Sequence, residues 1–105
     1  MKTATIEKNQ DLLELCSMVR ELVTIGEYDK GADIVCHAMG EHPDAPEPHN
    51  LLGIILENMG EHSKAMKHFR AARELDPTYR PASQNLSNYG TFYSSGVSAY
   101  DDSDC

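Results

Sequence analysis

Cysteine and histidine are the residue types in this chain of 105 residues that could bind a metal or act as nucleophiles. Cys16, Cys36 and Cys105 are widely spaced, and no CxxC pair or Cys/His cluster accompanies them. His42 and His49 flank a proline-rich connection, but no histidine pair has the four-residue helical spacing of a zinc site. We therefore predict no metal, no cofactor and no disulfide framework, and we expect reduced thiols.

The sequence also lacks the motifs that hold a catalytic nucleophile or a phosphate group. It contains no nucleophile elbow, no phosphate-binding glycine loop and no suggestive acid–base pair. Cys16 and Cys36 fall within helical patterns, where packing is their expected task. We predict that the protein is not an enzyme.

The formal net charge of −8 disfavours nucleic-acid binding, which usually needs an excess of lysine and arginine. Four basic residues nevertheless follow one another at steps of three: Lys64, Lys67, Arg70 and Arg73. Because each helical residue turns about 100°, such steps drift by about 60° and spread the charges over an outer surface. We interpret them as a solvated face, and nucleic-acid binding is the least favoured alternative.

Neither a signal peptide nor a membrane span is indicated. Residues 1–10 carry lysines but no apolar segment. The longest apolar run, residues 51–56, is interrupted by Gly53 and is far shorter than the roughly 20 residues of a transmembrane helix. We therefore expect no membrane partner and a cytoplasmic location.

Apolar residues recur at the three- and four-residue steps of amphipathic helices. Two such stripes are Leu12, Leu15, Val19 and Leu22, and Leu52, Ile55, Leu56 and Met59. Gly26 and Gly60 can take the left-handed conformation that ends a helix. Pro43 and Pro77 cannot continue a helix. The pattern predicts helices over residues 9–25, 28–40, 46–59 and 62–75, and a polar fifth helix over 80–89.

These helices form two similar units. The segment Gly26–Lys30 reappears as Gly60–Lys64, 34 residues later. The same offset pairs Leu22 with Leu56, Ala38 with Ala72, and Pro43 with Pro77. Each unit is therefore predicted to be a helical hairpin, with small residues where its two helices approach most closely.

A 34-residue helical hairpin with this pattern resembles the tetratricopeptide repeat. In the second unit the matching residues are the pair Leu52-Gly53, then Ala65 and Phe69 of A-x3-F, and the terminal Pro77. The first unit departs further from the pattern, with Met18-Val19, Gly31 and Val35 at the corresponding places. The resemblance implies an all-α fold, a right-handed α-solenoid of antiparallel helical hairpins.

The resemblance covers residues 12–79 and divides the chain into three parts. The predicted parts are a polar N-terminal segment (1–8), a repeat domain (9–89) and an acidic tail (90–105). Within the domain we expect repeats at about 12–45 and 46–79 and a capping helix at about 80–89. The tail is rich in Ser and Gly, and we expect it to be mostly disordered. Its aromatic residues, Phe92, Tyr93 and Tyr100, leave a short partner-binding segment as the alternative.

Tetratricopeptide repeat domains, as a family, bind peptides or partner proteins in a concave groove lined by the first helix of each hairpin. On those helices the side away from the apolar stripe carries the predicted groove residues: Arg20, Thr24, Asn50, Ile54, Glu57, Asn58, Gln84 and Asn88. The amides among them can hydrogen-bond an extended peptide backbone. The Lys/Asn clamp that some family members use for a carboxylate is incomplete, although Arg20 alone could meet one.

The resemblance therefore implies a protein–protein interaction module, an adaptor or scaffold, whose protein or peptide ligand the sequence does not identify. An oligomerisation or regulatory domain of a larger protein is the alternative. Two repeats and a cap are near the lower limit for a stable array, so a homodimer is also open.

Overall fold

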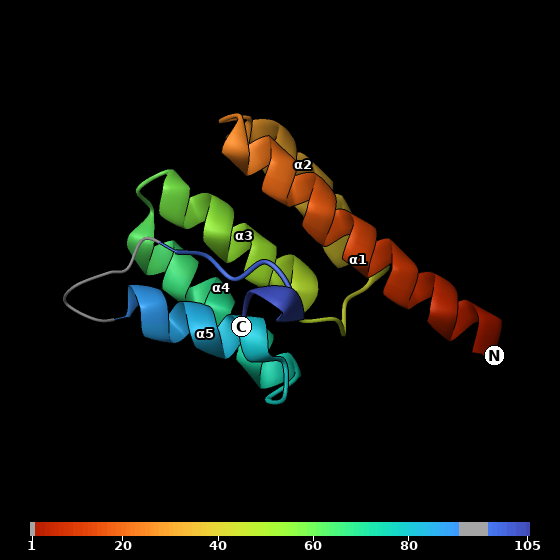
Figure 1. The fold of residues 1–105 in the computed structure, drawn as a ribbon. Helices are drawn as coiled ribbons and strands as arrows, with labels where there is room; N and C mark the ends of the chain where they lie inside the picture. Colours follow the sequence, from red (N-terminus) through yellow and green to blue (C-terminus); the bar gives the residue numbers. More distant parts are fainter. Residues whose placement is uncertain (1, 91–96) are drawn as a thin grey trace.

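The computed structural model describes residues 2–90 and 97–105, with side chains from Gln10 onward. The described chain consists of helices α1 (Lys2–Thr24), α2 (Tyr28–Glu41), α3 (Glu47–Asn58), α4 (His62–Leu75) and α5 (Arg80–Tyr89), and a 3-10 helix η1 (Asp102–Asp104) (Figure 1). No strand occurs over residues 2–90 or 97–105. The prediction of an all-α fold is confirmed.

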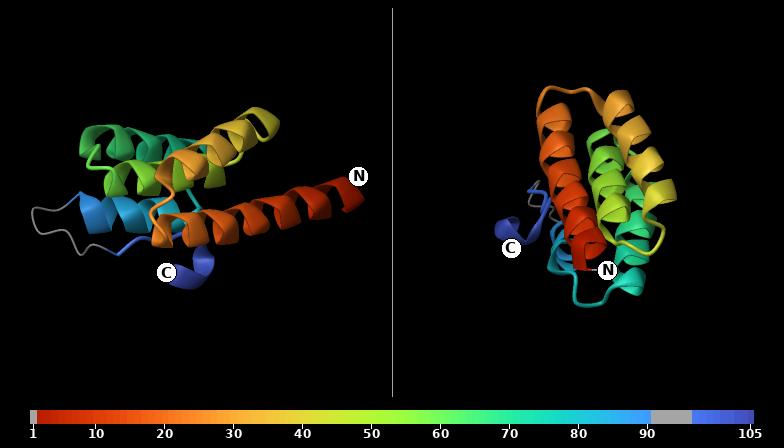
Figure 2. Two further views of the ribbon diagram at one scale, coloured as in Figure 1. Left: turned by 90° about the horizontal axis from the view of Figure 1, so that it is seen from above. Right: turned by 90° about the vertical axis from the view of Figure 1, so that its right-hand side faces the viewer.

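The helices form successive antiparallel hairpins (Figures 1 and 2). Helix α1 packs on α2, α3 packs on α4, and α5 closes the array against α4. Helix α3 also contacts both α1 and α2, so the two hairpins share one interface. This arrangement places α1, α3 and α5, the first helix of each unit, on one side of the molecule.

Helix α1 begins earlier than predicted. We expected a polar segment over residues 1–8 and a helix from residue 9, whereas α1 starts at Lys2. Residues 2–9 contain neither Pro nor Gly and include the good helix formers Ala4, Glu7 and Lys8, so nothing in them stops a helix. The apolar stripe starts only at Leu12, so the spacing of apolar residues could not predict this first part of the helix.

Both tight turns within the hairpins use a glycine in the left-handed conformation. Gly26 and Gly60 each have φ of 80°. In each turn the next amide reaches back to the carbonyl five residues earlier, Glu27 to Leu22 and Glu61 to Leu56, at 2.8 Å. This is the bond of a Schellman helix end, and it satisfies a carbonyl that the helix leaves unpaired. The 34-residue repeat in the sequence is therefore also a repeat in backbone geometry.

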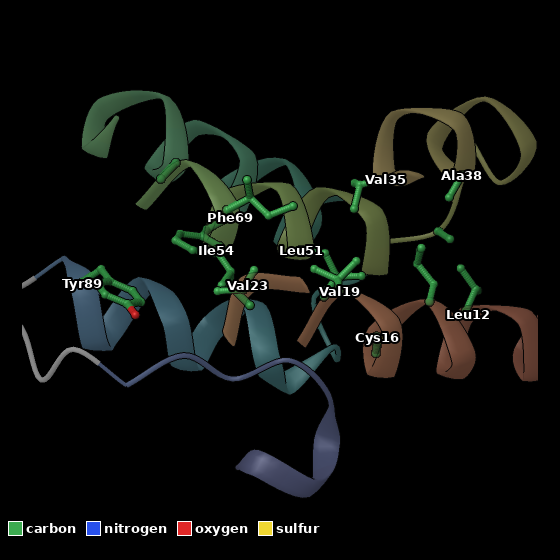
Figure 3. Packing of buried hydrophobic residues seen from close by; sticks show 14 of the residues in the cluster. Leu12, Cys16, Val19, Val23, Val35, Ala38, Leu51, Ile54, Phe69 and Tyr89 are labelled. Carbon is green, nitrogen blue, oxygen red and sulfur yellow. The ribbon is translucent and has the colours of Figure 1, made fainter. Parts of the chain in front are cut away.

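The core runs continuously through all five α-helices (Figure 3). Its residues with no exposed surface include Val19, Val35, Leu51, Ile54, Ile55 and Phe69. Gly53 allows α3 and α4 to approach closely, because a Cβ atom there would lie 2.5 Å from Cε1 of Phe69. The ring of Phe69 also stacks with that of Tyr89, with 6.1 Å between ring centroids, and this contact attaches α5 to the second hairpin.

Residues 97–105, which we expected to be disordered, pack against the helices instead. This segment, here called the C-terminal strap, runs extended and then turns into η1 (Figures 1 and 2). Ala99 is buried, with 1% of its surface exposed. Backbone atoms of Ala99 make three hydrogen bonds with side chains of the helices, and apolar periodicity cannot predict such contacts. The prediction is wrong for 97–105, while Phe92 and Tyr93 lie outside the described residues.

Candidate partner-binding groove

The C-terminal strap lies along the side of the molecule formed by α1, α3 and α5. Asn88 of α5 donates to the carbonyl of Val97, and Asn50 of α3 donates to the carbonyl of Ala99. Further along the strap, Arg20 of α1 binds Asp104. The predicted groove helices are therefore bridged by an extended segment of the same chain.

A pair of buried asparagines forms the centre of this groove. The side-chain oxygen of Asn85 accepts from the Ala99 amide at 2.7 Å, and its nitrogen donates to the Ala99 carbonyl at 2.8 Å. The same nitrogen donates to the side-chain oxygen of Asn50, whose own amide bonds the Ala99 carbonyl at 2.9 Å. Both asparagines have no exposed surface, and this network pairs their buried amide groups. Its hydrogen bonds go to backbone atoms of Ala99, so they do not depend on the identity of a side chain.

Arg20 provides the charged end of the groove. Its guanidinium lies 2.6 Å from the Asp104 carboxylate and 3.8 Å from that of Asp101. It also lies over the ring of Tyr100, 4.8 Å from the ring centroid. The hydrogen bond to Asp104 raises the pKa of Arg20. This end of the groove therefore favours an aromatic residue and a carboxylate.

Asp104 shows the same pairing from the other side. Burial alone would raise its pKa, but the backbone amide of Tyr100 and the Arg20 guanidinium more than offset this, and the net pKa is lowered. The Tyr100 amide donates to the carboxylate at 2.9 Å. Asp104 is therefore held as an anion by both its own segment and α1.

Four of the eight predicted groove residues belong to this network. Arg20, Asn50 and Asn88 contact the strap directly, and the Gln84 side chain donates to Asn88 at 2.9 Å. Three of the four come from different helices, so the structure brings together residues that are far apart in the sequence.

The structure places the other four predicted residues differently. Ile54 has no exposed surface and belongs to the core. Thr24 and Asn58 bond carbonyls of their own helices, those of Arg20 and Ile54. Glu57 accepts from His62 at the turn into α4.

Sequence reasoning missed Asn85, which makes two hydrogen bonds to the strap. It precedes Asn88 by three residues, so helical spacing alone could have added it to the predicted set. The contribution of the strap itself carried no such signal, because serine, glycine and aspartate usually indicate a solvated tail.

Cys16 lies beside the groove but is not suited to nucleophilic chemistry. Burial, followed by the nearby charge of Glu47, raises the pKa of its thiol to about 12. The thiol is therefore protonated at neutral pH and behaves as a small apolar group. It lines a hollow of about 190 Å³ with Tyr79 of the α4–α5 connection and with η1.

Two histidines meet between α3 and α4. The Nδ1 atoms of His49 in α3 and His68 in α4 lie 3.2 Å apart, and the rings stack. Burial lowers the pKa of both, and the charge of His49 lowers that of His68 further. Among residues 2–90 and 97–105, no three His, Cys, Asp or Glu side chains come together where a metal could be held.

No helix within the described ranges combines the length and the apolar character needed to cross a membrane. The chain matches the family of the tetratricopeptide repeat over residues 46–79, which span α3, α4 and the connection to α5. No solved structure matches the chain significantly. Repeats of this family generally mediate protein–protein interactions. The hairpin at 46–79 has the Gly53–Phe69 contact and the left-handed Gly60 that the repeat pattern requires, and residues 46–79 form a tetratricopeptide repeat.

Proposed function

We propose that the protein is a non-enzymatic adaptor or scaffold that binds a segment of a partner protein along α1, α3 and α5. The groove residues of this proposal are Arg20, Asn50, Gln84, Asn85 and Asn88, on which the contacts with the C-terminal strap converge. The proposed partner is a protein or peptide, and neither a nucleic acid nor a membrane is proposed as a partner. The free thiols of Cys16 and Cys36 support the cytoplasmic location that the sequence predicts.

One observation carries the proposal. Asn85 pairs with both the amide and the carbonyl of Ala99, while Asn50 pairs with the carbonyl as well. Two side-chain amides directed at the backbone N–H and C=O of one residue are a means of binding an extended backbone. Packing alone would be served better by apolar residues at these buried positions.

Site-specific photo-crosslinking can test which surface a partner uses. A photoreactive amino acid replaces Gln84, an exposed residue of the groove on α5. The matched control replaces Arg70, an exposed residue of α4 outside the groove. Both variants are illuminated in a lysate of the source organism, and crosslinked proteins are identified by mass spectrometry.

The proposal expects a protein that crosslinks from position 84 and not from position 70, and that is lost when Arg20→Glu is added. Crosslinks from position 70 alone would move the binding surface to the outer helices. Equal crosslinks from both positions would also count against the groove.

A second candidate function, an association domain, is favoured by the free edge of the first hairpin. On this edge α1 exposes 45% of Met18. Met18 and Ile34 line a hollow of about 180 Å³ between α1 and α2. A further hairpin would stack against such an edge in a longer array, so it could hold another part of a larger protein or a second copy.

A further inference from the structure

The C-terminal strap is bound with few of its side chains buried. Of residues 97–105, only Ala99 is fully buried, whereas 61% of Val97 is exposed. Because Ala99 is 1% exposed, its position leaves no room for a longer side chain. The strap therefore buries little apolar surface, and its attachment depends on hydrogen bonds and on the ion pairs of Arg20 with Asp101 and Asp104.

These contacts define a pattern that can be read along the strap. Ala99 supplies a small residue at the asparagine pair, and the next residue, Tyr100, lies under the Arg20 guanidinium. Asp104, four residues after the tyrosine, supplies the carboxylate at 2.6 Å from Arg20. Arg20 is the only basic residue among the groove residues named here, so it selects for a negative charge at this end.

The ion pair is also accessible to solvent. The Arg20 side chain is 42% exposed and that of Asp104 is 21% exposed. A pair of this kind contributes little to stability and can be exchanged for another carboxylate. Because the strap belongs to the same chain, its high effective concentration, of the order of millimolar for a short connection, keeps it in place.

From these contacts, and resting on the function proposed above, we infer that the strap is an internal ligand that occupies the partner's place. The partner's segment is acidic: it is extended at a small residue and the aromatic residue that follows, and then turns so that a carboxylate four residues after the aromatic one also reaches Arg20. Such a segment binds by displacing the strap, so the strap weakens binding of the partner until it is released.

A labelled peptide with the sequence of residues 97–105, with Cys105→Ser, serves as the probe. Its binding is measured by fluorescence anisotropy to three forms of the full chain: wild type, Ala99→Arg and Val97→Arg. Ala99→Arg places a long charged side chain at a position that is 1% exposed and should release the strap. Val97→Arg makes the same change at a side chain that is 61% exposed and is the matched control.

The inference predicts that Ala99→Arg binds the probe at least tenfold more tightly than the wild type and Val97→Arg do. Asp104→Asn in the probe should weaken binding by about two- to fivefold, the range for an exposed ion pair. Asp102→Asn, which removes the same charge from the same turn, should bind like the parent, because Arg20 pairs with Asp101 and Asp104. N-methylation at Ala99 should abolish binding, because it removes the amide hydrogen that Ala99 donates to the side-chain oxygen of Asn85.

Equal binding of the probe by wild type and a folded Ala99→Arg variant would overturn the inference. Should Ala99→Arg fail to fold by circular dichroism, the full chain with Asp104→Asn replaces it and is compared with Asp102→Asn. The former must then bind the probe about two- to fivefold more tightly, and equal affinities would overturn the inference. The photo-crosslinking test is independent: a groove-specific partner there, with no probe binding here, removes the internal ligand and leaves the proposed function.

Discussion

At the scale of single residues, the groove presents groups that bind main-chain atoms and one that binds charge. Asn50 and Asn85 offer donors and an acceptor at fixed places, because each is fully buried and hydrogen-bonded to the other. Arg20 offers a planar cation that contacts a ring and a carboxylate at once. We therefore expect Asn50 and Asn85 to bind the backbone of an extended segment and Arg20 to select for an acidic one.

The residue that most closely determines the packing of the second repeat is Gly53. Its replacement by Ala should lower the free energy of unfolding by about 1–3 kcal/mol, the usual cost of overpacking, because the new Cβ would lie 2.5 Å from Phe69. Gly40→Ala in α2 is the matched control, since a Cβ there meets nothing within 4 Å. Urea denaturation would measure both, and equal stabilities would contradict the α3–α4 contact.

The Arg20–Asp104 pair should make strap attachment sensitive to acid. The folded pKa of Asp104 lies below its ordinary value of 3.8, so the pair contributes fully above about pH 4 and is lost as the pH falls through the lowered value. Screening by solvent limits the effect to about 0.2–1 kcal/mol. NMR shifts of the Ala99 amide between pH 6 and pH 3 would follow it, and Asp104→Asn should remove the dependence. An unchanged titration in that variant would contradict the pairing.

At the scale of elements, most of the helices were predictable because their ends carry chemical signals. Gly26, Gly60, Pro43 and Pro77 mark helix ends, and the predicted ranges 28–40 and 62–75 agree with α2 and α4 to within one residue. The start of α1 was not predictable in this way, because residues 2–9 carry neither a breaker nor an apolar stripe.

The α3–α4 pair should lose stability in mild acid. His49 and His68 have lowered pKa values in the folded state, so the unfolded chain binds more protons below pH 6.5 and stability falls as the pH drops. His68→Gln should flatten the decrease in Tm between pH 7.5 and 5.5. His37→Gln, at a side chain that is 78% exposed, is the control. A slope that His68→Gln leaves unchanged would contradict the histidine contact.

At the scale of the whole molecule, the C-terminal strap covers the side of the repeat array that α1, α3 and α5 form. The repeat pattern placed Arg20, Asn50, Gln84 and Asn88 on one side, and the structure connects them through a single segment. The occupant of that side could not be predicted, because a segment bound through its backbone leaves no periodic signature in its side chains.

The second candidate function, association through the free edge of α1 and α2, can be tested by changing Met18. If the edge mediates association, Met18→Lys should weaken it at least tenfold in sedimentation experiments, because a charge replaces an apolar contact. Leu75→Lys, at a residue of α4 that is 40% exposed, should have no such effect. A wild type that stays monomeric at all concentrations would remove self-association through this edge.

The internal ligand requires that the strap lie in the groove of the folded protein. Hydrogen exchange of the Ala99 amide in the full-length wild type tests this directly. That amide donates to Asn85 at 2.7 Å in a residue with 1% exposure, so it should exchange much more slowly than in an unstructured peptide. Addition of unlabelled probe peptide should speed its exchange, because the probe displaces the strap. Exchange at the rate of a free peptide, with the amides of α3 still protected, would contradict the occupied groove and the internal ligand together.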